Sequence, residues 1–441
     1  MSRFLPKTLL TLSLLLAGAA FAGAAEPVDS LALPTGKTDW VDPVKAVAPG
    51  CEYVVYPTPS RGADTQASCM VYTPAGYDAA SGRRYPVVYY LHGGTGNQRE
   101  ARWMIAEVDK AIREGRMEPI IVVSPQALPI GWYINANTSD PKVTSGPIRD
   151  VIIEDLIPYI DANYSTIASP SGRGIEGFSM GGRGALALAF GNPDLFGAVS
   201  SVAGAVVNWE EEPLQRALEC TFGDVDDPFS KLYFDSWHPA GFACRNADQI
   251  RERDMKVRLF VGDRDRLYNE NGNAITERFH NVLERLGINH SYTIVPGADH
   301  NPAEIFDPAV NTYDVAFWDT AFANAALPEG ILSFLATNFP GASILSAKTV
   351  EEANGPHYLL DLSDGTHLKF NEHSNWIRVT SDRGPVAAGL VHQGIRDYLE
   401  SIPEGSVSKI RSIEKVPRVG YDVTFDDGAH LTFDTTGRLL K

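Results

Sequence analysis

The sequence predicts an α/β protein with a mostly parallel eight-stranded sheet, followed by a small α+β domain built from two repeats. Between residues 51 and 326, short apolar runs alternate with helical segments, which is the pattern of a parallel sheet covered on both faces. From residue 327 onward, the same residue types recur at a constant spacing. The two observations together predict two folded domains of different architecture.

The composition is that of a globular, acidic protein. Of the 441 residues, 44% are hydrophobic and 21% are charged, which is enough apolar material for a sizeable core. The formal net charge is −17 at pH 7. This balance argues against nucleic acid and anionic membrane surfaces as partners, because both repel an acidic protein.

Residues 1–25 have the features of a secretory signal peptide. Arg3 and Lys7 supply positive charge, an apolar run follows at 9–16, and Ala20-Phe21-Ala22 has the small-residue form of a cleavage site. We therefore expect a secreted or periplasmic protein. Residues 26–50 are rich in proline and are expected to form an extended lead-in, and no later segment has the length and apolarity of a membrane span.

Four cysteines remain after the leader, and an even number in an oxidising compartment favours disulfides. Cys51 and Cys69 flank a predicted hairpin, and Cys220 and Cys244 bracket one excursion between strands. We prefer disulfides between Cys51 and Cys69 and between Cys220 and Cys244, with the other pairings open. No Cys–His cluster has the spacing of a zinc site, so no metal and no cofactor is expected.

Residues 51–326 are expected to form the α/β domain. Predicted strands lie at 52–56, 68–72, 86–91, 119–124, 173–177, 197–203, 257–261 and 291–295, and the first two form a hairpin. Helical spacing of apolar residues, such as Ile152, Leu156 and Ile160, predicts helices at 100–115, 148–164, 182–190 and 274–287. Eight strands with a leading hairpin match the plan of the α/β-hydrolase fold.

Residues 327–441 repeat themselves. Tyr358 recurs as Tyr421, 63 positions later, and the same offset relates Asp364 to Asp427, Gly365 to Gly428, His367 to His430 and Phe370 to Phe433. Each unit is predicted to contain a helix, a long strand and a hairpin that turns at Asp-Gly. A metal site at His367 and His430 is not expected, because no carboxylate or cysteine recurs there with ligand spacing.

This repeat resembles the PepSY-like, β-lactamase-inhibitor-protein-like modules of exported bacterial proteins. The resemblance is carried by Phe339-Pro340-Gly341, Tyr358, Asp364-Gly365, Phe370 and Trp376, and then by Ile402-Pro403, Tyr421, Asp427-Gly428 and Phe433. It implies a fold and an export context but no chemistry. A binding partner of this domain is left open.

The segment Gly177-Phe178-Ser179-Met180-Gly181 has the form Gly-x-Ser-x-Gly. It follows a predicted strand and precedes a helix of small residues, which is the setting that the nucleophile elbow of a serine hydrolase requires. Glycine on both sides permits the sharp turn, and the helix N-terminus favours developing negative charge. Ser179 is therefore the predicted nucleophile, and the N–H of Met180 is a predicted oxyanion donor.

A serine hydroxyl needs a general base, which follows an acid in the chain order of this fold. The histidines between Ser179 and the repeats are His238, His280, His290 and His300. Of these, His300 follows a predicted strand at the sheet edge where Ser179 lies, so it is the predicted base. The acid should follow the preceding strand, where Asp263 and Asp265 both occur. We prefer Asp265, because Asp263 is closer to the strand and is placed to stabilise the loop.

Residues 51–324 resemble the esterase D family, which contains feruloyl, acetyl-xylan and enterochelin esterases and mycolyltransferases. The resemblance is carried by Tyr72-Thr73-Pro74-Ala75-Gly76-Tyr77, Leu91-His92-Gly93-Gly94, Asp155-Leu156-Ile157-Pro158-Tyr159-Ile160, Gly177-Phe178-Ser179-Met180-Gly181-Gly182, and Gly297 with His300. It implies Ser179, Asp265 and His300 as nucleophile, acid and base, with Gly94 beside Met180 in the oxyanion hole. The family often has Gly-Gly-His before the base, whereas this chain has Gly297-Ala298-Asp299-His300.

The resemblance implies a serine esterase but leaves the ester open. Trp132, Tyr133 and Trp209 follow predicted strands, and an aromatic wall suits a feruloyl group or a sugar face. We expect feruloyl or acetyl esters of plant cell-wall polysaccharides as substrates. An acyltransferase, a polyester or siderophore esterase of the same family, and a catalytically inactive hydrolase fold used for binding are the alternatives.

Overall fold

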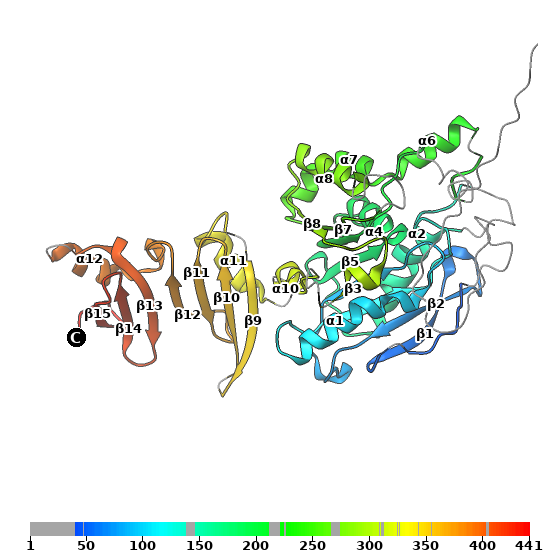
Figure 1. The fold of residues 1–441 in the computed structure, drawn as a ribbon. Coiled ribbons are helices and arrows are strands. Elements are labelled where there is room, and N and C mark those ends of the chain that lie inside the picture. The colour runs from blue at the N-terminus through cyan, green and yellow to red at the C-terminus, as the bar shows by residue number, and fades with distance from the viewer. Residues whose placement is uncertain are drawn as a thin grey trace, which may run out of the picture.

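A computed structural model describes residues 40–46, 48–137, 146–210, 221–224, 226–265, 274–307, 309, 313–323, 325, 327–342, 344–353, 355–402 and 405–441. The predicted signal peptide, most of the lead-in and Cys220 lie outside these residues. Two sheets, each with its own helices, make up the described part (Figure 1). Every helix within it is too short or too polar to cross a lipid bilayer.

The first sheet has eight strands in the order β1-β2-β4-β3-β5-β6-β7-β8. They are β1 (Cys51–Pro57), β2 (Gln66–Tyr72), β3 (Val87–Leu91), β4 (Ile121–Pro125), β5 (Arg173–Phe178), β6 (Ala198–Val202), β7 (Lys256–Gly262) and β8 (Ser291–Val295). β1 and β2 form an antiparallel hairpin, β2 is antiparallel to β4, and the other pairs are parallel. The predicted fold class is thus confirmed.

Helices cover both faces of this sheet, because its strands bury side chains on both sides. In β3, Val87 and Tyr89 belong to one core cluster, whereas Val88 and Tyr90 belong to the other. The first cluster is covered by α2 (Ile148–Asp150), α3 (Ile157–Asn163), α4 (Met180–Gly191), α6 (Pro228–Ser236), α7 (Pro239–Glu252) and α8 (Ala274–Arg285). The second is covered by α1 (Arg102–Arg113), α9 (Pro302–Ile305) and α10 (Ala316–Phe322). A π-helical turn, Val151–Leu156, joins α2 to α3 where the sequence predicted one continuous helix.

A buried ionic network ties together the strands that carry the candidate site. Glu176 on β5 accepts hydrogen bonds from Arg258 on β7 (Nη2 to Oε2, 3.0 Å) and from the hydroxyl of Tyr313 (3.0 Å to Oε1). Arg258 also donates to Oγ of Ser200 on β6 at 3.0 Å. All four side chains are buried. Because removal of one partner from a buried ion pair costs about 3–5 kcal/mol, this network holds β5, β6 and β7 in a fixed arrangement.

The predicted Cys51–Cys69 disulfide is wrong. In the β1–β2 pair, Cys51 lies opposite Tyr72, and Cys69 lies opposite Val54. The two cysteines are therefore about 10 Å apart along the strands and point to opposite faces of the sheet, whereas a disulfide requires Cα atoms within about 7 Å. Cys244 is exposed on α7, and its pairing with Cys220 stays a prediction.

The second sheet has seven antiparallel strands in the order β15-β14-β13-β12-β11-β10-β9. They are β9 (Ile344–Glu352), β10 (Gly355–Leu362), β11 (Thr366–Phe370), β12 (Trp376–Ser381), β13 (Ile410–Val416), β14 (Gly420–Phe425) and β15 (His430–Asp434). Helices α11 (Glu329–Asn338) and α12 (Gln393–Ser401) pack on this sheet around a third core cluster.

The predicted repeat is confirmed by the order of these elements. Helix α11, strand β9 and the hairpin β10–β11 correspond to α12, β13 and β14–β15. Both hairpins turn at Asp-Gly, where Gly365 and Gly428 have φ of +84° and +82°. Asp364 and Asp427 each accept a hydrogen bond from the backbone N–H two residues on. The same turn chemistry therefore closes both units.

Helix α10 packs on the first sheet and α11 on the second (Figure 1). We propose that the two domains meet between Phe322 and Glu329, close to the change predicted at residue 327. Helix α10 of the first domain contacts strand β9 of the second. In this contact, Oγ1 of Thr320 donates a hydrogen bond to the carbonyl oxygen of Leu345 at 3.4 Å.

Candidate active site

Ser179 lies at the turn between β5 and α4, with φ of 55° and ψ of −117°. Such a backbone is strained for any residue with a side chain. A Cβ on Gly177 would lie 2.3 Å from the backbone of Gly181, and a Cβ on Gly181 would lie 2.0 Å from the carbonyl oxygen of Leu91. The two glycines are therefore required by the close approach of backbone segments, as the motif predicted.

His300 bridges Ser179 and Asp265. Its Nε2 lies 2.8 Å from Oγ of Ser179, and its Nδ1 lies 2.8 Å from Oδ2 of Asp265. The side chains of His300 and Asp265 are only 9% and 8% exposed, so the hydrogen bonds are shielded from water. The ring of Phe178 packs against the imidazole at 4.8 Å between centroids and limits its rotation.

Asp263 has a different role from Asp265. Its Oδ1 accepts a hydrogen bond from the backbone N–H of Gly297 at 2.8 Å, which closes the loop between β8 and His300. Asp299, in the departure from the Gly-Gly-His pattern, accepts the backbone N–H of His300 at 2.7 Å. Both carboxylates thus hold the loop, while Asp265 holds the imidazole.

The other candidate histidines lie elsewhere. His238 caps α7, where its Nδ1 accepts the N–H of Ala240 at 3.2 Å. His280 and His290 form a hydrogen bond with each other beside α8. Among these four histidines, His300 lies within hydrogen-bond distance of Ser179, and its role as the base stays a prediction.

The two predicted oxyanion-hole donors are Gly94 and Met180. Met180 directly follows Ser179, and the strand that precedes Gly94, β3, pairs with β5, which leads to Ser179. Gly94 belongs to the loop after β3, and Met180 is the first residue of α4. The backbone N–H groups on either side of Gly94 are already hydrogen-bonded within the protein. The N–H of Gly93 donates to Oε1 of Glu100 at 2.8 Å, and the N–H of Thr95 donates to the carbonyl oxygen of Pro129 at 2.8 Å. Within the described residues, the N–H groups of Gly94 and Met180 meet no acceptor, so both can donate to a ligand.

His92 has a structural role in the loop after β3. It is fully buried, its Nδ1 lies 2.8 Å from the carbonyl oxygen of Gly93, and its Nε2 accepts the N–H of Ala127 at 3.2 Å. Burial lowers the pKa of His92, so the ring stays neutral and keeps both bonds. The ring thereby connects the glycine loop to the loop after β4.

Glu100 is a residue that the sequence analysis missed. Its carboxylate accepts the N–H of Gly93 and so holds the glycine loop in place. The available signal was its position, a carboxylate shortly after the Gly93-Gly94-Thr95-Gly96 run.

We expect Glu100→Gln to remove a pH-dependent part of the protein's stability. Burial raises the pKa of Glu100 to about 7, whereas an unfolded glutamate titrates near ~4.3. The native state holds this proton through that interval, so its stability falls as pH rises from about 4.3 to 7. Glutamine keeps an acceptor for Gly93 but cannot ionise. In thermal unfolding, the Tm of Glu100→Gln relative to that of the wild type should therefore be higher at about pH 8 than at about pH 5. The same Tm difference at both pH values would contradict this prediction.

The three predicted substrate-binding aromatics are buried in the described structure. Tyr133 is inaccessible, donates its hydroxyl to the carbonyl oxygen of His92 at 2.8 Å, and packs so tightly on α4 that a Cβ on Gly184 would lie 2.5 Å from its ring. Its predicted substrate contact is therefore replaced by a structural role, because its hydroxyl and ring are both used inside the core. Trp132 and Trp209 are 3% and 6% exposed, and their contact with substrate stays a prediction.

Arg183, one turn into α4, also occupies this aromatic region. Its Cζ lies 5.5 Å from the ring centre of Trp132, 5.7 Å from that of Phe222 and 5.0 Å from that of Phe234. The guanidinium is fully buried and meets no hydrogen-bond acceptor in the described residues, and burial lowers its pKa to about 9. The ring faces therefore stabilise its charge.

Comparison with known proteins extends these observations. A family model described as Esterase matches residues 60–324, and one described as beta-lactamase-inhibitor-like, PepSY-like matches residues 356–441. An endo-1,4-beta-xylanase/feruloyl esterase of Xylanibacter ruminicola is 32% identical over 180 residues, covering 38% of this chain and 24% of the relative. An esterase of Mycobacterium tuberculosis is 39% identical over 124 residues, covering 28% of this chain and 26% of the relative. The chain thus spans about a quarter of the length of these relatives.

Solved structures are similar to part of this chain. A ferulic acid esterase has a TM-score of 0.46 at 18% identity and covers 59% of this chain and 96% of its own. An S-formylglutathione hydrolase from Agrobacterium tumefaciens has a TM-score of 0.44 at 20% identity and covers 59% of this chain and 92% of its own.

Proposed function

This chain belongs to the Esterase family, and from that premise we propose that it is an exported serine esterase that hydrolyses carboxylic esters. The observation that carries the proposal is the continuous hydrogen-bonded path from Ser179 through His300 to Asp265, with 2.8 Å at each step. A nucleophile, a base within reach of it and an acid that orients the base are what acyl transfer through serine requires.

The proposed reaction has two halves. Oγ of Ser179 attacks the ester carbonyl carbon while Nε2 of His300 takes the hydroxyl proton, and the carbonyl oxygen becomes an oxyanion that accepts the N–H groups of Gly94 and Met180. The ester C–O bond then breaks, and His300 returns the proton to the leaving alcohol. Water attacks the acyl-enzyme by the same route and releases the acid. Asp265 keeps the imidazole in the productive tautomer and stabilises its positive charge.

For the natural substrate we propose feruloyl or acetyl esters of plant cell-wall polysaccharides. The support is the similarity to a xylanase/feruloyl esterase. The test is release of ferulate from methyl ferulate and of acetate from acetylated xylan, with p-nitrophenyl acetate as a general ester and a fluorophosphonate as a label of the serine. If the protein hydrolyses p-nitrophenyl acetate but neither methyl ferulate nor acetylated xylan, the proposal of an esterase stands and the proposal of a cell-wall substrate is wrong. Absence of both turnover and labelling would favour the inactive binding fold, and ester products formed with added alcohols would favour an acyltransferase.

Export is the third part of the proposal. It rests on the charge and apolar pattern of residues 1–25. N-terminal sequencing of the protein from the extracytoplasmic fraction should give a start near residue 23–26.

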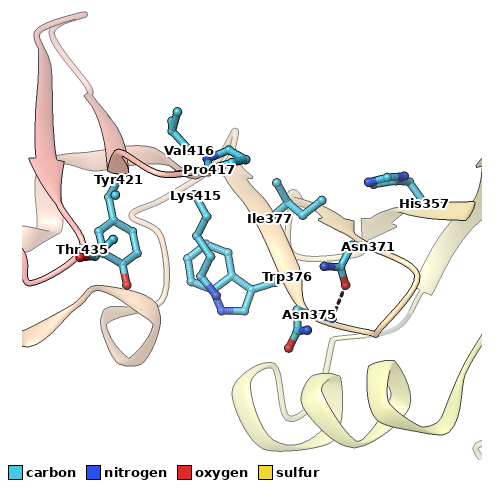
Figure 2. A pocket seen from close by; sticks show the side chains of 11 residues that line it. His357, Asn371, Asn375, Trp376, Ile377, Lys415, Val416, Pro417, Tyr421 and Thr435 are labelled. Atoms are coloured by element: carbon cyan, nitrogen blue, oxygen red, sulfur yellow. Dashed lines mark hydrogen bonds between the residues drawn. The ribbon is translucent and has the colours of Figure 1, made fainter. Parts of the chain in front are cut away.

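For the C-terminal domain we propose that it binds the polysaccharide. A pocket of about 360 Å³ opens where β12 and β13 separate, since these strands pair through Arg378–Glu414, Val379–Ile413 and Thr380–Ser412 and then diverge. Figure 2 shows its lining, in which Lys415 lies over Trp376 and Asn375 lies beside the indole. Nζ of Lys415 is 3.7 Å from the ring centre of Trp376, and Asn371 also lines the pocket. The side-chain oxygen of Asn371 accepts the backbone N–H groups of His373 and Asn375, so Asn371 would offer a sugar its NH₂ group as a donor. Amide groups beside aromatic rings suit sugar hydroxyls and sugar faces.

We expect Trp376→Ala to weaken binding to insoluble xylan without changing hydrolysis of soluble p-nitrophenyl acetate. The indole supports Lys415 and forms a wall of the pocket, and a buried aromatic contact is worth about 1 kcal/mol or more, so affinity should fall at least ~5-fold. Pull-down with insoluble xylan measures the effect, and Tyr358→Ala, a partly buried tyrosine outside the pocket lining, is the control. If Trp376→Ala binds insoluble xylan as well as the wild type does, this pocket is not the polysaccharide site.

A further inference from the structure

A second cluster of functional side chains lies at the sheet edge away from Ser179. His280 and Glu284 are four residues apart on α8, and therefore lie on one face of that helix. His290 stands between α8 and the first residue of β8. One ligand atom from each of the three side chains lies within 4.8 Å of the other two.

The hydrogen bonds of His290 orient it for a cation. Its Nδ1 donates to the carbonyl oxygen of Ile288 at 2.8 Å, which leaves the lone pair of Nε2 directed at Nδ1 of His280, 2.7 Å away. A histidine that donates one ring N–H to a backbone carbonyl and presents the other nitrogen is the usual arrangement of a metal ligand. The side chain is 1% exposed, so its ring is fixed by packing.

The other two ligands are placed to complete a site. The ring of His280 stacks on Tyr292 at 4.8 Å between centroids and 24° between planes. Oε1 of Glu284 lies 4.0 Å from Nε2 of His290, and its side chain is 63% exposed, so it can turn toward a cation. Two imidazoles and one carboxylate are ligands that Zn²⁺ accepts, with water in the fourth position.

We propose that His280 Nδ1, His290 Nε2 and the carboxylate of Glu284 bind a zinc-class divalent cation. Zinc–nitrogen bonds of about 2.0–2.1 Å in a tetrahedron put the two nitrogens about 3.3 Å apart, so they separate by roughly 0.6 Å on binding. The proton that His280 carries on Nδ1 when it donates to His290 moves to Nε2 through solvent, and no net charge change at the histidines is required.

The site ties together the segment that carries the acid and the base. Strand β7 ends just before Asp265, α8 follows, and β8 leads into the loop of His300. A cation that joins α8 to the start of β8 therefore stabilises this β-α-β unit. The proposed cation site lies at the start of β8, whereas Ser179 follows the end of β5, so the two are at opposite edges of the sheet and the role of the cation is structural. The sequence analysis expected no metal site because two histidines and a glutamate without cysteine have no recognised ligand spacing.

The test uses the full chain without a polyhistidine tag, stripped with EDTA and titrated with ZnCl₂ by calorimetry and thermal unfolding. We expect one tight site per chain and a higher Tm with zinc. Loss of an outer-shell partner weakens metal binding by about 10–100-fold, so loss of a direct ligand in His280→Ala should exceed this. In Co²⁺-substituted protein, the visible absorption of a tetrahedral site should vanish in the same variant.

The matched control is His367→Ala. His367 is an exposed histidine between two carboxylates, with its Nε2 2.9 Å from Asp382 and its Nδ1 2.5 Å from Asp361. Zinc binding that is lost in His367→Ala and kept in His280→Ala, or absent from the wild type at millimolar zinc, would overturn the proposal. If His280→Ala fails to fold, Glu284→Gln replaces an exposed side chain and should still weaken binding at least ~10-fold; unchanged affinity in that variant would also overturn it.

Discussion

Replacing Ser179 with alanine is expected to lower kcat for p-nitrophenyl acetate by about four to six orders of magnitude, because nucleophile and base act as one unit. The fold should survive. Alanine meets the same backbone strain at φ of 55°, and the hydroxyl's bond to His300 contributes about 1 kcal/mol to stability. The measurement is single-turnover and steady-state hydrolysis, with circular dichroism and Tm beside it.

The matched control for this variant is Ser201→Ala. Ser201 lies on β6 opposite Gly177 of β5 and is 2% exposed, so it is a buried serine in the same part of the sheet. Its activity should stay within a few-fold of the wild type. Retention of fluorophosphonate labelling and turnover in Ser179→Ala, with a contaminating esterase excluded, would remove Ser179 as the nucleophile.

Asp265→Asn is expected to lower kcat by about 10⁴-fold, whereas Asp263→Asn should cost about tenfold or less. An asparagine at 265 would present its amide to Nδ1 of His300 and leave the imidazole in the wrong tautomer. At 263, an asparagine oxygen can still accept the N–H of Gly297, which is 2.8 Å from the present carboxylate. The loop should therefore keep its shape.

The pair of aspartate variants tests which of the two carboxylates orients His300. Each should be measured for hydrolysis and for the rate of phosphonate labelling, since labelling reports the reactivity of Ser179 without a complete turnover. If Asp263→Asn proved the more damaging of the two, the acid would be Asp263, and Asp265 would support the loop.

Several features were predictable because their causes are local. The strained turn at Ser179 needs glycine at 177 because a Cβ there would lie 2.3 Å from the backbone of Gly181, within the same five residues. The Asp-Gly turns at Gly365 and Gly428 need positive φ, which their own residue type supplies. Apolar periodicity placed the eight strands and the helical segments that contain α1, α2 with α3, α4 and α8, because each element buries its own face. Helices α6, α7, α9 and α10 were not predicted.

Contacts between distant segments were decided by tertiary structure. The choice between Asp263 and Asp265 depends on how two loops meet at the sheet edge, and both residues fit the chain order equally well. The Cys51–Cys69 pairing failed because strand register puts the two side chains on opposite faces, and a register shift of one residue reverses every side chain.

What the sequence by itself determined is therefore the class of fold and the repeat, since these follow from periodicity and turn chemistry within short segments. It also predicted Ser179 as the nucleophile and His300 as the base, from the glycine motif and the chain order of the fold. Tertiary structure alone decided which carboxylate orients His300, that Tyr133 supports His92 inside the core, that Glu100 holds Gly93, and that His280, Glu284 and His290 converge. The physical reason is that hydrogen bonds and ligand sets act over about 3 Å, and such distances between remote residues are set by packing and register.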